Sequence, residues 1–180
     1  EQGFTALMEC PVPIIAAVNG HAYGGGLETA LCCDFIYAAK GAKLALSELR
    51  LGIMPGGAGT QNLPRAVGER RAKELILTAR AFSAEEGAQW GLVNRVCEQG
   101  KTLADALETA RQIAENAPLA VRQAKKSVHY GLQMDLLTAP VRVVTDDGRV
   151  TGLECVRMEL GEPDASGRRS PKPVRGSEFV

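Results

Sequence analysis

The sequence predicts an α/β protein, and three observations lead to this class. Two apolar runs, residues 14–18 and 35–39, show no alternation of apolar and polar residues, which is typical of strands buried on both faces. The first run enters a turn of three consecutive glycines, Gly24, Gly25 and Gly26, and an apolar helical segment leaves it. Residues 102–116 repeat apolar side chains at helical spacing. Buried strands interspersed with helices define the α/β class.

Length, composition and charge describe an ordinary soluble domain. The 180 residues suffice for one domain with a real core, and 45% are hydrophobic. The 21 basic and 21 acidic residues cancel, which gives no support to broad binding of nucleic acids or anionic membranes. No apolar run approaches the ~20 residues of a membrane span. An odd count of 5 cysteines fits a reducing compartment. With no secretory or transit segment visible, we expect a cytoplasmic protein.

The first half of the chain is predicted to place short strands around two glycine-rich turns. Pro11 and Pro13 end an initial helix. The expected elements then follow in this order: a strand at 14–18, the first glycine turn, a helix at 27–33, a strand at 35–39, a turn at 40–43, an extended segment at 44–46 and a second glycine-rich loop at 55–61.

The second half is predicted to be helical up to about residue 135. Ser83 and Glu86 have the spacing of a capping box, which begins a short helix. The other expected elements are helices at 69–78, 102–116 and 118–130 and a short strand at 92–96. Beyond residue 135 the character changes: residues 141–160 predict a β-hairpin around Asp147-Gly148, and the tail, 161–176, is expected to be unpacked. We therefore expect two domains, 1–135 and 136–180.

Two carboxylates stand out because each lies near a glycine-rich loop. Glu28 begins the helix after the first loop, and Glu48 precedes the second. If both loops face one cleft, the two acids could share a water molecule, one acting as a base towards it and the other passing a proton to carbon. A plain alternative stays open, since glutamates near helix ends also stabilise the helix dipole. Likewise, the glycine turn either offers N–H groups to a developing negative charge or only permits close packing.

Other common chemistries lack their motifs. Neither glycine loop completes the G-x-G-x-x-G dinucleotide fingerprint, and no P-loop lysine follows either of them. The cysteines show no zinc-ligand spacing. His21 and His129 have no serine or cysteine nucleophile in a recognisable motif, and G-x-S-x-G is absent.

At this point the chain resembles a known family, on the stretch PIIAAVNGHAYGGGLETALCCDFIYAAKGAKLALSELRLGIMPGGAGTQNLPRAVG. This stretch is similar to the core of the enoyl-CoA hydratase/isomerase (crotonase) superfamily. The likeness continues through AKELILTARAFSAEEGAQWGLVNRV and LAVRQAKKSVHYGLQMDL and covers about residues 10–135. It implies the ClpP/crotonase fold, a spiral of ββα units followed by helices.

The resemblance also implies roles for four residues. Glu28 and Glu48 match the two catalytic glutamates, and Gly25 matches a donor of the oxyanion hole that binds the thioester carbonyl. Gly56 matches a loop glycine whose N–H helps to hold the catalytic water. The implied reaction is syn addition of water to a trans-2-enoyl-CoA, giving a 3-hydroxyacyl-CoA, as in fatty acid or branched-chain acyl-CoA metabolism. Coenzyme A is then part of the substrate, and neither a separate cofactor nor a metal is expected.

The chain departs from the family pattern at both ends. The family's N-terminal portion, with the second oxyanion N–H from an alanine in an A-x-x-K-like segment, has no counterpart here, so we expect a chain truncated at its N-terminus with impaired activity. Residues 137–180 resemble instead a fragment of FAD/NAD(P)-binding oxidoreductases related to the glutamate synthase small subunit, which suggests a chimera. The helices that build the family's homotrimers and hexamers would then be replaced.

Three hypotheses remain. The first is an enoyl-CoA hydratase-type lyase acting on an acyl-CoA thioester. The second is a catalytically silent crotonase-fold protein that binds acyl-CoA or a protein partner. The third, a flavin or NAD(P) oxidoreductase fragment, rests only on the C-terminal segment.

Overall fold

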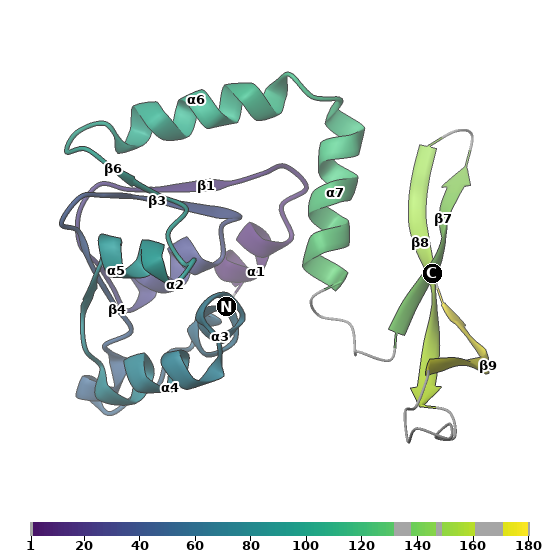
Figure 1. Ribbon diagram of the computed structural model, residues 1–180, viewed down its shortest axis with the longest axis horizontal. Coiled ribbons are helices and arrows are strands. Elements are labelled where there is room, and N and C mark those ends of the chain that lie inside the picture. Colours follow the sequence, from purple (N-terminus) through teal and green to yellow (C-terminus); the bar gives the residue numbers. More distant parts are fainter. Residues whose placement is uncertain (1, 132–137, 147–148, 161–170, 180) are drawn as a thin grey trace. The chain divides into compact units, whose positions relative to one another are not determined.

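The computed structural model describes residues 2–131, 138–146, 149–160 and 171–179. The chain divides into two compact units, Glu1–Arg122 and Gln123–Val180, and each is described by itself. The first unit is an α/β layer structure, shown in purple to teal in Figure 1. Its elements are α1 (Gln2–Met8), β1 (Ile15–Val18), β2 (Ala22–Tyr23), α2 (Gly25–Leu31), β3 (Phe35–Ala39), β4 (Lys43–Ala45), η1 (Glu48–Leu51), α3 (Gly59–Val67), α4 (Glu69–Thr78), β5 (Phe82–Ser83), α5 (Ala84–Gln89), β6 (Arg95–Cys97) and α6 (Thr102–Ala114).

A parallel sheet in the order β1–β3–β6 forms the centre of this unit. The central strand β3 is buried at four of its five positions, as its apolar sequence predicts. The prediction that the first strand is buried on both faces is wrong, because all four residues of β1 are half-buried. The reason is position: among the described strands β1 has a neighbour on one side only.

Helices cover both faces of this sheet. In Figure 1, α6 runs along one face and α2 and α5 lie on the other. The core between them is built from fully buried apolar side chains, of which the largest are Phe82, Leu27, Leu44, Leu46, Leu63 and Leu75. Burying a leucine side chain contributes roughly 1.5–3 kcal/mol, so this core fixes α2, α3 and α4 against the sheet.

A second small sheet, in the order β2–β4–β5, joins a strand before the first glycine turn, one between the two glycine loops and one after the second loop. Strand β2 pairs in parallel with β4, and β4 pairs antiparallel with β5. His21 Nδ1 accepts a hydrogen bond from the Lys43 N–H at 3.0 Å, so this histidine ties the entry of β2 to β4. The sheet therefore sets the distance between the first glycine turn and η1.

Helix α3 is the main element that the sequence did not predict. It begins inside the second glycine-rich loop and contains Pro64, and both features normally argue against a helix. Tertiary packing outweighs them, because Leu63 is fully buried in the core. The helices that the sequence did predict lie within two or three residues of their expected bounds. Ser83 and Glu86 form the predicted capping box.

Helix α7 (Pro118–Gly131) begins in the first unit and ends in the second. The second unit also holds an antiparallel sheet of β7 (Thr138–Asp146), β8 (Arg149–Leu160) and β9 (Pro171–Phe179). The predicted hairpin is present as β7 and β8, and its turn, 147–148, lies outside the described residues.

The prediction of an unpacked tail is wrong over residues 171–176, because residues 171–179 form β9 on the second edge of β8. Prolines 171 and 173 lack the N–H of an inner strand, but an edge strand tolerates them. The rest of the predicted tail, 161–170, lies outside the described residues. Every helix that the structure describes is too short or too polar to span a bilayer.

Candidate active site

The first glycine turn fixes the start of α2. Gly24 has φ 54° and ψ −126°, a conformation that glycine adopts without strain and other residues rarely do. Its N–H donates to the Ala45 carbonyl of β4 at 2.8 Å, and its own carbonyl accepts the Glu28 N–H at 3.0 Å. The turn thus fixes the start of α2 against the small sheet and sets the direction in which the Glu28 side chain projects from the helix.

Glu28 is buried, with 4% of its surface exposed. Its Oε1 atom accepts two backbone hydrogen bonds, from the Gly57 N–H at 2.7 Å and the Gly59 N–H at 2.9 Å. Hydrogen bonds to an ionised acceptor are among the stronger ones in proteins. The second glycine loop therefore holds the Oε1 oxygen of Glu28 with two N–H groups.

The loop must be built from very small residues. A methyl group on Gly57 would lie 2.8 Å from Glu28 Oε2 and 2.5 Å from Phe4 Cζ, and one on Gly59 would lie 2.9 Å from Glu28 Oε1. Between them Ala58 has φ 78°, in the left-handed region. Such conformations cost about 1–3 kcal/mol in non-glycine residues and concentrate at functional sites.

Glu48 lies close to the same turn. It is the first residue of η1 and is 8% exposed. A methyl group on Gly24 would lie 3.3 Å from Glu48 Oε1. Within the described part of the chain, neither of its buried carboxyl oxygens has a hydrogen-bond partner. An unsatisfied carboxyl group inside a protein is costly, and the natural partner for one beside a glycine turn is a water or ligand atom.

The structure thus brings Glu28, Glu48 and the first glycine turn together. Gly25 is the exposed first residue of α2, so its N–H has no acceptor within its own helix. Gly56 is also exposed, and no atom lies within 4 Å of a methyl group built on it. The bonds to Glu28 come from its neighbours Gly57 and Gly59, which sequence reasoning did not single out.

The titration of a nearby thiol reflects the buried setting. Burial raises the pKa of Cys32, and the adjacent Cys33 and Glu28 raise it further. Cys32 lies one helical turn after Glu28, and its raised pKa keeps this thiol protonated near neutral pH.

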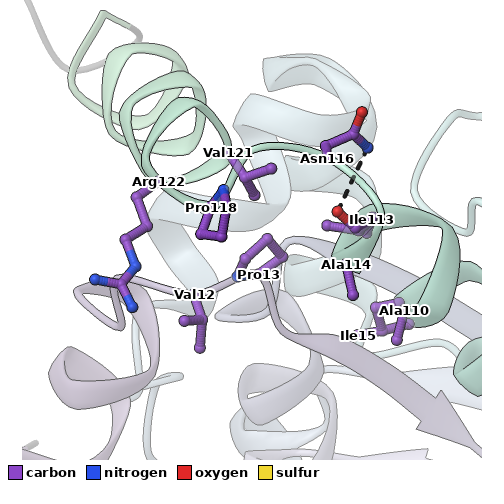
Figure 2. Close-up of a pocket in the computed structure, with 10 residues that line it drawn as sticks. All are labelled: Val12, Pro13, Ile15, Ala110, Ile113, Ala114, Asn116, Pro118, Val121 and Arg122. Atoms are coloured by element: carbon purple, nitrogen blue, oxygen red, sulfur yellow. Dashed lines mark hydrogen bonds between the residues drawn. The ribbon is translucent and has the colours of Figure 1, made fainter.

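Two of the hollows on the described part of the first unit bear on the site. One, of about 290 Å³, is bordered by Tyr23, Ala45, Ser47, Arg50 and Leu51 and is adjacent to Glu48 along the chain. Figure 2 shows the other, of about 280 Å³, where Pro13, Ile15, Ile113 and Val121 form an apolar lining beside Arg122. No carboxylate lines this second hollow, so it cannot serve two-acid chemistry.

Comparison with solved structures gives the class of the fold. The chain superposes on an enoyl-CoA hydratase from Bacillus anthracis with a TM-score of 0.73 and 47% sequence identity, over 75% of this chain and 52% of that one. A second enoyl-CoA hydratase structure, from Geobacillus kaustophilus, gives a TM-score of 0.72 at 40% identity. The predicted crotonase fold is confirmed.

The family follows from sequence. The model of the enoyl-CoA hydratase/isomerase family matches residues 1–143, and the chain therefore belongs to this family. It is 47% identical over 132 residues to the mitochondrial methylglutaconyl-CoA hydratase of Mus musculus, covering 71% of this chain and 42% of that protein. It is 44% identical over 124 residues to the carnitinyl-CoA dehydratase of Salmonella typhi, covering 69% and 48%. The chain spans about half the length of these relatives.

The comparisons do not bear out the resemblance of residues 137–180 to oxidoreductases, and they give no evidence of a chimera. The family match runs to residue 143, beyond the predicted junction. In the site itself, two N–H groups of the second glycine loop donate to Glu28, whereas a dinucleotide-binding loop donates such N–H groups to phosphate.

Proposed function

We propose that the protein is a hydratase-type lyase, which adds water to a trans-2-enoyl-CoA to give a 3-hydroxyacyl-CoA. The observation that carries this proposal is that two buried glutamates adjoin the first glycine turn: Glu28, held by two N–H groups, and Glu48, which has no hydrogen-bond partner among the described residues. A fold optimised only for stability would replace or satisfy the Glu48 carboxyl.

In this mechanism the two carboxyl groups share the proton transfers. One takes a proton from water as the water oxygen bonds to C3 of the enoyl group. Electrons of the C2=C3 bond move towards the thioester oxygen, and the other carboxyl group gives a proton to C2. The sum is one water added across the double bond. A positioned acid or base typically contributes 10²–10⁴-fold to the rate.

The Gly25 N–H is proposed to donate a hydrogen bond to the thioester oxygen, on which negative charge develops. It lies at the positive end of α2 without an acceptor in that helix. Loss of one oxyanion-hole donor typically costs roughly 10²–10³ in rate. The Gly56 N–H is proposed to bind the attacking water.

The substrate class is proposed from the relatives. Both curated relatives described above carry names of enzymes that act on acyl-CoA thioesters. We propose the same class here, with coenzyme A as part of the substrate and no separate cofactor. Assembly into homotrimers or hexamers stays a prediction, which light scattering of the purified chain tests.

The test is hydration of crotonyl-CoA, followed by loss of the enoyl absorbance, in wild type and in Glu28→Gln and Glu48→Gln. We expect each substitution to lower kcat/KM by at least about 100-fold. The matched control is Glu98→Gln, which alters a glutamate whose side chain is 70% exposed and pairs with Lys40. A wild-type rate in either site variant would overturn the two-carboxylate mechanism.

A wild type that binds crotonyl-CoA in calorimetry without hydrating it would favour the silent acyl-CoA-binding alternative. Because the chain spans about half of its relatives, the same assay should be run on the chain alone and after addition of a polypeptide covering the remaining family sequence. Recovery of activity only in the second case would show that hydration needs residues that the added polypeptide supplies.

A further inference from the structure

The loop segment that holds Glu28, residues 57–59, has further contacts of its own. Gly57 donates its N–H to Glu28 of α2, and its carbonyl faces Cys32, the C-cap residue of the same helix. There the Cys32 thiol donates to the Gly57 carbonyl, with 3.7 Å between sulfur and oxygen. Cys32 is 5% exposed. One turn of α2 thus reaches the loop twice, through the Glu28 carboxylate and through the Cys32 thiol.

The side chain of Asn62 joins the same group from α3. Its Nδ2 atom donates to the Leu31 carbonyl at 3.2 Å, at the end of α2, and lies 3.7 Å from Cys32 Sγ. Since a carbonyl only accepts, the amide nitrogen must face it. The Asn62 backbone N–H donates to the Ala58 carbonyl at 2.8 Å. Asn62 therefore connects the strained residue of the loop to the last turn of α2.

These contacts matter because the loop conformation is costly. Ala58 sits in the left-handed region, so the segment needs outside contacts to keep its shape. Both N–H groups aimed at Glu28 flank that residue. A small rotation at Ala58 would turn at least one of them away from the carboxylate.

We infer that Cys32 and Asn62 are positioning residues, which hold residues 57–59 in the conformation that directs two N–H groups at Glu28. Neither residue touches the reacting atoms; both act through the loop. The expected effect on turnover rests on the proposed function, whereas the effect on the loop does not.

Amide hydrogen exchange at Gly57 and Gly59, measured by NMR, tests the effect on the loop. We expect exchange about 3- to 10-fold faster in Cys32→Ala, which removes the thiol bond to the Gly57 carbonyl, and in Asn62→Leu, which removes the amide bond to the Leu31 carbonyl. Cys32→Ser keeps a donor and should restore most of the protection. The matched control is Cys33→Ala, because the Cys33 thiol follows α2 and donates to the Thr29 carbonyl of that helix, not to the loop. Asn62→Asp, of nearly equal volume, replaces Asn62→Leu if that variant does not fold.

Unchanged exchange at Gly57 and Gly59 in both Cys32→Ala and Asn62→Leu would overturn the inference. Equal acceleration in Cys33→Ala would also overturn it, since the effect would then come from a general loosening of α2. With crotonyl-CoA, we expect the two variants to lower kcat about 3- to 10-fold while KM stays within about twofold. A wild type without hydration activity would reject the proposed function and leave the exchange result to decide the inference.

Discussion

Glu28 and Glu48 both lie in the first turn of a helix, but their side chains have opposite surroundings. Glu28 satisfies two buried N–H groups, and Glu48 satisfies none in the described part of the chain. Removing one partner of a hydrogen bond leaves a buried group unsatisfied, whereas removing an unpartnered polar group relieves a cost. The same substitution should therefore have opposite effects on stability at the two positions.

We predict that Glu48→Met raises the free energy of unfolding by about 1–3 kcal/mol and that Glu28→Met lowers it by a similar amount. Both variants should lose hydration activity. Urea denaturation followed by circular dichroism measures the difference. A Glu48→Met protein less stable than wild type would show that Glu48 is held by the fold and not by a substrate.

The glycine loop offers a second contrast between neighbouring residues. We predict that Gly57→Ala lowers the free energy of unfolding by about 1–3 kcal/mol, because the new methyl group would lie 2.5 Å from Phe4 Cζ and 2.8 Å from Glu28 Oε2. Gly56→Ala is the control, since no atom lies within 4 Å of its new methyl group. Equal stability of the two variants in urea would contradict the close approach at Gly57.

At the scale of elements, local sequence predicts the start of a helix where residues of its own first turn cap it. The start of α5 is a capping box: Ser83 Oγ accepts the Glu86 N–H at 3.1 Å, and Glu86 Oε2 accepts the Ser83 N–H at 2.8 Å. The Ser83 N–H holds the pKa of Glu86 below its ordinary value, and Arg80 adds to this effect.

A pH dependence of stability follows from the capping box. Because the folded state binds a proton at Glu86 less readily than the unfolded chain, this contribution is complete above the unfolded pKa of about 4.3. It is lost as the pH falls through the lowered folded pKa. We predict a shallower loss of unfolding free energy below about pH 4.3 in Glu86→Gln than in wild type. Identical slopes in urea titrations at several acidic pH values would contradict this origin.

At the scale of the whole molecule, the site depends on the folded first unit. Its parts come from the turn before α2, from η1 and from the loop before α3, and the parallel sheet and core bring them together. Burial of thiols reports the integrity of this unit. Burial raises the pKa of Cys97 to about 11, and Asp105 adds to the shift.

We predict that a disulfide reagent at pH 8 labels the half-buried Cys10 well before Cys32 and Cys97. At that pH only about one Cys97 thiol in a thousand is ionised in the folded state. Peptide mapping after timed labelling identifies each site, and labelling in urea gives the unfolded rates. Rapid labelling of Cys97 in buffer would contradict a closed core around β6.

Much of the fold is readable from local sequence because it depends on local energetics. Residues 35–39 form a buried strand as their apolar run predicts, and Ser83 with Glu86 caps a helix at the expected place. Helix α3 and strand β9 were not predicted, because their formation depends on contacts with residues distant in the sequence. Leu63 in the core compensates for Pro64, and the free edge of β8 takes up residues 171–179.

The sequence by itself determined the α/β class, the crotonase resemblance and the choice of Glu28 and Glu48, since glycine turns and carboxylates are legible at short range. Only the tertiary structure decided that Gly57 and Gly59 hold Glu28, that Glu48 has no hydrogen-bond partner among the residues described, and that Cys32 and Asn62 contact the loop and the end of α2. Hydrogen bonds between residues about 30 positions apart leave no periodic trace in the chain, because they depend on how the sheets and the core bring those residues together.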